Sequence, residues 1–311
     1  MIAIAAWFGG VWRVVRSPWL VAFAYVLLLV ATVPLGLLLH RDLPPSSQPT
    51  VVEPGAGPAP NVDWLEEVTA GRGGLLGTLS PTVVGVAAPL DNLDRLLDAR
   101  HPPLFAVALA AVSLIVWSWL WGGIISLAAS TRRRFFAACA HSFTSILKVS
   151  VIGVGAAIVL YLTLHPLLFR VVWPAVTAGA SERIAFAWRV ALVLPFVVTL
   201  TLSTLIADYA RISIVLNDSL PIGAAIRNAL AIVRHNAIAV LVLVVLSAVL
   251  LAGLLVVYGA FEFIPGGSVP TLGRVILLGQ AFVVTRLVLR CVNAAAQVLL
   301  YQRITRRAAI R

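Results

Sequence analysis

Long apolar runs separated by shorter polar segments dominate the pattern along the chain. We interpret six of them as membrane spans, because a helix needs about 20 mostly apolar residues to cross the hydrocarbon. They cover residues 19–39, 104–129, 149–169, 189–207, 237–259 and 275–300. The longest uncharged runs, 104–129 and 237–259, support this interpretation most clearly. The pattern predicts an all-α membrane protein with six transmembrane helices.

Amphipathic segments precede three of the spans. Residues 135–152 and 221–238 align without gaps at a shift of 86, and the N-terminal segment aligns with them when Arg16 is placed opposite Lys148. Each copy is an amphipathic stretch that ends in a base and leads directly into a span. We therefore predict an internal repeat of three hairpins, each preceded by a cytoplasmic amphipathic helix. The corresponding segments are 1–18, which we expect to be interfacial, 130–148 and 208–236.

The clearest surface helix is predicted over residues 219–235. Ser219 can cap its N-terminus, and Pro221 falls in the first turn, where a missing N–H is harmless. Its apolar residues share one face and are Ile222, Ile226, Leu230 and Val233. We expect the helix to lie at headgroup depth with this face toward the lipid. It serves either as an elbow that orients the next span or as a docking surface for a cytoplasmic protein partner.

The longest polar segment, 41–103, separates the first two spans. Six prolines between residues 43 and 60 predict an extended linker. Capping-type and amphipathic patterns between 61 and 100 predict short helices. We expect a helical extracytoplasmic cap, which is either structural or a lid that binds a partner. Because no other segment is long and apolar enough for a second core, residues 1–311 are predicted to form a single polytopic membrane domain.

Composition and charge support this topology. The chain is 61% hydrophobic and 11% charged, against about 25% charged in soluble domains. Its net charge is +11, yet the 41–103 segment holds eight acids and four bases and is net −4. Of the 19 bases outside that segment, 13 cluster beside span ends in alternate segments, as the positive-inside rule requires. Both termini are therefore predicted to be cytoplasmic, with the basic rims facing anionic lipid headgroups rather than nucleic acid.

The sixth predicted span carries a polar stripe at helical spacing. Arg286, Arg290, Asn293 and Gln297 fall at i, i+4, i+7 and i+11, on a single face. An arginine near the centre of a span costs about 2.5–3.5 kcal/mol on insertion scales, so something must compensate for it. The stripe is therefore a candidate site.

The fourth predicted span carries a second stripe, formed by Thr201, Thr204 and Asp208. We hypothesise that the two stripes face each other, with Asp208 meeting Asn293 or Gln297 and Arg290 reaching a threonine. An arginine left in a cavity would clamp phosphate, so these seven residues form a candidate binding site for an anionic lipid or a small anionic solute. In the alternative interpretation, both arginines snorkel or brace the bundle.

Sequence signatures of catalysis are absent from the chain. It contains no GxxxxGK[ST], HExxH or GxSxG motif, and its five histidines form no ligand pair at i, i+4. We expect no catalytic residues, no metal site and no cofactor, which favours a non-enzymatic role. The alternatives are a membrane subunit or scaffold of a larger complex and, less favoured, a lipid-modifying intramembrane enzyme.

Several segments carry a resemblance to known proteins. They are Asp208-Tyr209-Ala210-Arg211 with the following helix 219–235, and residues 62–67, 79–81 and 90–93 of the outer segment. In these the chain resembles a group of uncharacterised bacterial six-span integral membrane proteins. Its hairpin plan is loosely similar to the membrane domain that accompanies some glycerophosphodiester phosphodiesterases. The resemblance implies a location in the bacterial inner membrane and supplies no catalytic residues.

Overall fold

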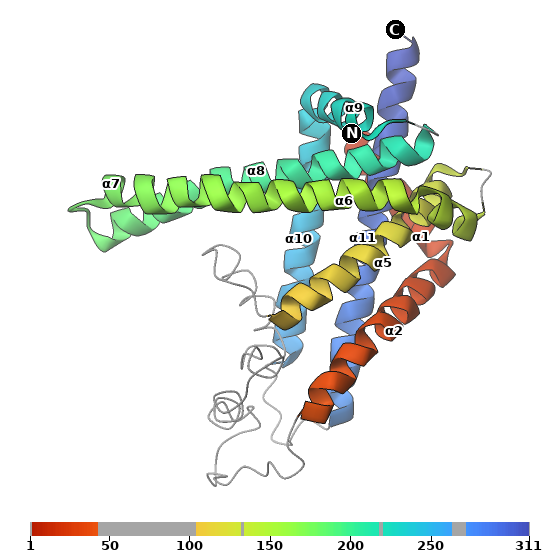
Figure 1. Cartoon of the computed structure of the whole chain (residues 1–311), viewed down its shortest axis with the longest axis horizontal. Coiled ribbons are helices and arrows are strands. Elements are labelled where there is room, and N and C mark those ends of the chain that lie inside the picture. Colours follow the sequence, from red (N-terminus) through yellow and green to blue (C-terminus); the bar gives the residue numbers. More distant parts are fainter. Residues whose placement is uncertain (1, 43–103, 132–133, 218–219, 263–271, 311) are drawn as a thin grey trace. The chain divides into compact units, whose positions relative to one another are not determined.

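A computed structural model describes residues 2–42, 104–131, 134–217, 220–262 and 272–310 (Figure 1). Over these residues the backbone is almost entirely helical and contains no strand. The predicted all-α fold class is therefore confirmed. The predicted cap falls almost entirely, from residue 43 to 103, outside the described residues.

The described helices follow one another along the chain with short breaks. They are α1 (Ile2–Val15), α2 (Pro18–Asp42), α5 (Leu104–Ala129), α6 (Phe135–Pro166), the π-helix η3 (Leu167–Val172), α7 (Trp173–Thr177), α8 (Glu182–Leu216), α9 (Ile222–His235), α10 (Ala237–Glu262) and α11 (Leu272–Ile310). Five helical segments are long and apolar enough to cross a membrane, and a sixth results if α1 and the start of α2, which bend by 76° at their break, count as one span. The multi-pass character is confirmed by length and composition, while the arrangement as three hairpins stays a prediction.

Two of the three predicted surface helices are separate helices. α1 ends before Pro18, and a proline at the first position of a helix cannot continue the preceding one. α9 ends at His235, and Asn236 separates it from α10. The predicted amphipathic segment 130–148 is not a separate helix, because residues 135–166 form the single helix α6, and its place at the cytoplasmic surface stays a prediction. No proline or glycine interrupts residues 135–152, so the helix runs on unbroken into the predicted span.

The chain divides into two compact units. The first unit comprises residues 1–13, 117–243 and 293–311, and the second comprises residues 14–116 and 244–292. The boundaries pass through α1, α5, α10 and α11, so neither unit is a contiguous stretch of sequence. The expectation of a single polytopic domain over 1–311 stays a prediction.

In the first unit, α6 and α8 lie side by side as an antiparallel hairpin closed by η3 and α7, and α9 folds back onto α8 (Figure 1). Small residues allow close helix approach at the start of this hairpin. A Cβ atom on Gly122 of α5 would lie 2.6 Å from the carbonyl oxygen of Ala138 on α6. Such glycine-mediated contacts are typical of helices packed within membranes.

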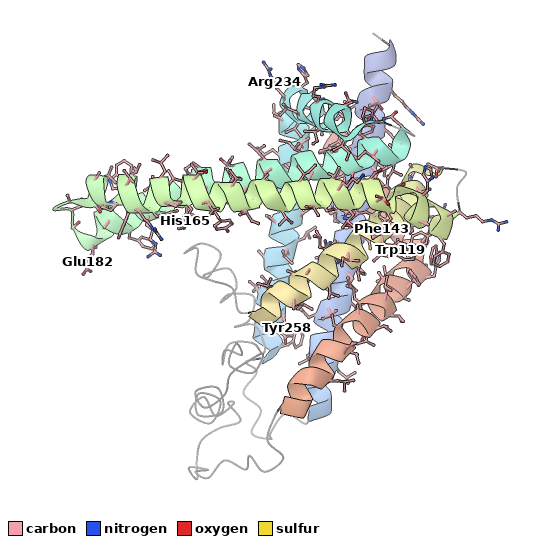
Figure 2. All side chains as sticks on the ribbon, in the orientation of Figure 1. Trp119, Phe143, His165, Glu182, Arg234 and Tyr258 are labelled. Carbon is pink, nitrogen blue, oxygen red and sulfur yellow. The ribbon has the colours of Figure 1, made fainter. Side chains whose placement is uncertain are left out.

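The protein-facing side of α9 is formed by small residues. Its buried residues are Ala225, Ala229 and Val233, whereas Leu230 is 51% exposed. That the face with Leu230 contacts lipid stays a prediction. The alanine face lets α9 approach α8 closely, and it turns the basic residues outward. Figure 2 shows Arg234 on the outer side of α9.

The second unit has its own contacts between helices. The hydroxyl of Tyr25 on α2 donates to Oε1 of Gln280 on α11 at 2.7 Å. The rings of Tyr258 on α10 and Phe282 on α11 lie 4.7 Å apart. The N-terminal half of α11 therefore contacts both α2 and α10.

Candidate functional site

Three helices of the first unit contribute to a polar cluster around Asp208, which we call the Asp208 cluster (Trp121, Asp208, Arg211 and Gln297). Nη1 of Arg211 lies 2.5 Å from Oδ1 of Asp208, and Nε2 of Gln297 donates to Oδ2 at 3.4 Å. The guanidinium carbon of Arg211 lies 5.7 Å from the centroid of the Trp121 ring. The carboxylate therefore accepts from both α8 and α11, and the guanidinium lies over an aromatic ring of α5.

Local helix geometry explains part of this arrangement. Asp208 and Arg211 are three residues apart on α8, a spacing that puts two side chains on neighbouring turns of one helix face. Their side chains are only 22% and 14% exposed. Leaving either charge unpaired at that burial would be costly, so the pair and the cation–π contact stabilise each other's placement.

A second set of polar contacts connects the last turns of the same three helices. The Tyr301 hydroxyl on α11 donates to Oγ of Ser213 at 3.4 Å and accepts from Nδ2 of Asn217 at 3.3 Å. Nε2 of Gln302 donates to the carbonyl of Ala129 at 3.3 Å. The C-terminal parts of α5, α8 and α11 are thus held together by polar groups on successive turns.

Three buried polar atoms in or next to the Asp208 cluster have no hydrogen-bond partner. They are Nε of Arg211, Oε1 of Gln297 and the hydroxyl of Tyr209. An unsatisfied buried polar group costs about 1–3 kcal/mol. A donor and an acceptor left open around one carboxylate match the needs of a water molecule or of a polar ligand group.

The structure brings Asp208 and Gln297 of the predicted site together. The hypothesis that Asp208 meets Gln297 is confirmed by their contact. Thr204 instead donates its hydroxyl to the carbonyl of Thr201, within α8. Asn293 lies in the first unit with Asp208, whereas Arg286 and Arg290 belong to the second unit and are exposed. The contact of Arg290 with a threonine stays a prediction.

Sequence reasoning missed two members of the Asp208 cluster, Arg211 and Trp121. The signal for Arg211 was present, because an acid and a base three residues apart on a helix are neighbours. No signal identified Trp121, which lies on another helix about 90 residues before Arg211. Its contact depends on the packing of α5 against α8.

A separate aromatic group lies in the α6–α8 hairpin, on the side nearer α7 (Figure 2). His165 is buried among Tyr161, Phe169 and Phe196, with ring centroids 6.1, 4.7 and 5.4 Å from its own. The π-helix η3 begins two residues later, and π-helical turns often occur at functional sites. In this chain the group packs the far part of α6 against α8.

The exposed arginines of α11 lie deep along the helix. Arg286 precedes Arg303 by 17 residues, which is about 25 Å at the α-helical rise, and Arg290 precedes it by about 20 Å. The hydrocarbon core is about 30 Å thick. If Arg303 lies at the inner headgroup edge, both guanidiniums originate within hydrocarbon depth. Among the described residues, Arg286 has no hydrogen-bond or ion-pair partner.

In the part of the chain that the structure describes, no three His, Cys, Asp or Glu side chains are grouped so as to hold a metal ion. Comparison with protein-family models, with curated proteins and with solved structures yields no match.

Proposed function

We propose that the protein is a multi-pass membrane protein that binds an anionic lipid headgroup or a small anionic solute through Arg286 and Arg290. The observation that carries the proposal is Arg286, an exposed guanidinium on an apolar helix with no partner among the described residues. A guanidinium presents a planar fork of N–H donors that matches the oxygens of phosphate and carboxylate groups.

The spacing of the two arginines supports binding over bracing. Arg286 and Arg290 lie four residues apart on α11, so their guanidiniums are on one face. Like charges at this spacing destabilise a helix, and the penalty is larger in a low dielectric. One anion that contacts both guanidiniums removes this repulsion and supplies acceptors for Arg286.

We place the protein in the inner membrane of a bacterium, with both termini cytoplasmic and the spans arranged as three hairpins. Two observations support this topology. Thirteen of the 19 bases outside the 41–103 segment cluster beside alternate span ends. Nη1 of Arg303 donates to the carbonyl of Ile2 at 3.1 Å, so the first turn of α1 lies beside the C-terminal part of α11.

Binding by purified full-length protein tests the proposal. The probes are phosphatidylglycerol in nanodiscs and inorganic phosphate, and the readout is the dissociation constant. Arg286→Gln and Arg290→Gln are each expected to weaken binding about 10-fold, because a hydrogen bond to a charged group contributes about 1.5–3 kcal/mol. The matched control is Arg170→Gln, which removes one exposed positive charge from the α6–α8 hairpin and is expected to leave binding unchanged.

Unchanged binding in the double variant Arg286→Leu/Arg290→Leu, with the protein still folded, would show that these arginines only brace the bundle. The second candidate is a membrane subunit of a larger complex, which the outward-facing basic side of α9 favours. A soluble protein that co-purifies in stoichiometric amount and is released by Arg227→Glu/Arg234→Glu would support that role instead.

A further inference from the structure

Helix α1 has two faces of different character. Ala3 and Ala6 are almost fully buried, whereas Ile4, Phe8 and Trp12 are 49%, 63% and 57% exposed. The exposed residues recur every four positions and form one stripe of large apolar side chains. A short helix that buries small residues against protein and exposes bulky ones is suited to lie in the membrane interface, with the stripe in the acyl-chain boundary.

α11 holds α1 in a defined position within the first unit. The Arg303 guanidinium donates to the carbonyls of Ile2 at 3.1 Å and Ala5 at 3.4 Å. A Cβ atom on Gly9 would lie 2.8 Å from Cδ1 of Leu299, so the two helices touch along more than one turn. Because these contacts fix Arg303, its remaining N–H donors are fixed in place as well.

Arg13, near the end of α1, carries a buried donor with no acceptor. Its Nη1 atom is buried and has no hydrogen-bond partner, and the Arg303 guanidinium is close enough to repel it electrostatically. Arg303 uses two of its five N–H donors on backbone carbonyls, which leaves donors for another acceptor. Two like charges and an unsatisfied buried donor are a costly arrangement unless an anion lies between them.

We propose that Arg13 and Arg303 bind the phosphate group of an anionic phospholipid of the inner leaflet, whose acyl chains lie along the exposed stripe of α1. The two guanidinium groups supply the positive charge that neutralises the phosphate. Ile4, Phe8 and Trp12 supply the apolar surface next to it. A free phosphate ion would use only the first of these features. The site lies wholly in the first unit and does not depend on Arg286 or Arg290.

Thermal unfolding of the full-length protein in nanodiscs tests the inference. Discs of phosphatidylcholine alone are compared with discs that also contain phosphatidylglycerol, with Arg13→Gln as the variant. Because Arg13 has no protein partner to lose, the variant is expected to fold and to match or exceed the wild-type Tm in phosphatidylcholine. In the Arg286→Gln/Arg290→Gln background, where only this site remains, Arg13→Gln is expected to abolish the Tm gain from phosphatidylglycerol, with an affinity about 10-fold weaker.

Three comparisons make the result decisive. Arg16→Gln removes an exposed positive charge three residues further on and is expected to keep the full phosphatidylglycerol gain. Phe8→Ala/Trp12→Ala is expected to weaken phosphatidylglycerol binding while leaving binding of inorganic phosphate unchanged. Arg286→Gln is expected to leave the effect of Arg13→Gln on Tm unchanged, which separates this site from the α11 arginines.

The inference is wrong if Arg13→Gln retains the whole stabilisation by phosphatidylglycerol. It is also wrong as a lipid site if inorganic phosphate alone gives wild-type protein the full gain, since the occupant would then be a free anion. Substitution of Arg303 would change both the lipid site and the position of α1, because that side chain also donates to carbonyls in the first turn of α1.

Discussion

Arg211 has defined contacts on two sides near the C-terminal end of α8. Nη1 is paired with Asp208 and the guanidinium plane lies near Trp121, while Nε is buried without a partner. Nε2 of Gln297 donates a hydrogen bond to the second carboxylate oxygen of Asp208. A buried ion pair contributes little net stability, but loss of one partner leaves the other charge uncompensated. The cluster therefore specifies how α8 and α11 meet more than it adds to stability.

Replacing the carboxylate tests this interpretation. Asp208→Asn is expected to lower the free energy of unfolding by about 2 kcal/mol, because Arg211 then remains charged and unpaired. The double variant Asp208→Asn/Arg211→Gln is expected to lose less than the sum of the single variants, as measured by denaturation in mixed micelles. Thr204→Val, which removes only a hydroxyl bonded within α8, serves as the control and is expected to change stability by less than about 0.5 kcal/mol. Strict additivity would contradict a direct interaction.

At the residue scale, pattern reasoning succeeded where spacing along one helix was enough. The stripe on the fourth predicted span identified Asp208, and the stripe on the sixth identified Gln297, so their meeting was predicted. Trp121 was missed because its role depends on which face of α5 packs against α8. The partnerless state of Arg13 was not predicted, because burial of a single atom follows only from tertiary packing.

The helices of this chain differ in the residues that end them and in the residues that allow close packing against another helix. Pro18 and Asn236 mark the breaks that separate α1 and α9 from the helices that follow. α6 lacks such a residue early in its course and is continuous through the predicted surface segment. Close approach depends on glycine, and Gly122 and Gly123 lie directly against the first turns of α6.

A pair of glycine substitutions tests this packing. At Gly122, a Cβ atom would collide with the Ala138 backbone, which cannot move as a flexible side chain could. Gly122→Ala is expected to destabilise the protein by about 1–3 kcal/mol. At Gly155 of α6, no atom lies within 4 Å of the added Cβ, so Gly155→Ala is expected to be neutral or to stabilise the protein by up to about 1 kcal/mol. Equal effects on Tm at the two positions would show that α5 and α6 do not touch there.

At the scale of the whole molecule, the proposed topology places both ends of the chain on one side of a membrane, which the contact of Arg303 with the first turn of α1 supports. Green fluorescent protein fused to the C-terminus is expected to fluoresce in cells, and alkaline phosphatase inserted between residues 61 and 100 is expected to be active. These outcomes correspond to a cytoplasmic terminus and an external segment. A fluorescent C-terminal fusion together with an inactive phosphatase between residues 61 and 100 would place both positions in the cytoplasm and contradict the proposed topology.

The sequence by itself determined that this is an all-helical protein with helices long and apolar enough to cross a membrane, because apolar run length and charge placement are local properties of the chain. It also indicated several helix ends, because a proline or a polar segment that interrupts a helix does so within about one turn. Only the tertiary structure decided which face of α9 is buried, that Trp121 lies beside Arg211, and that Nη1 of Arg13 is buried without a hydrogen-bond partner among the described residues. These depend on contacts between residues far apart in the chain, and hydrophobic periodicity specifies a face but not its neighbour.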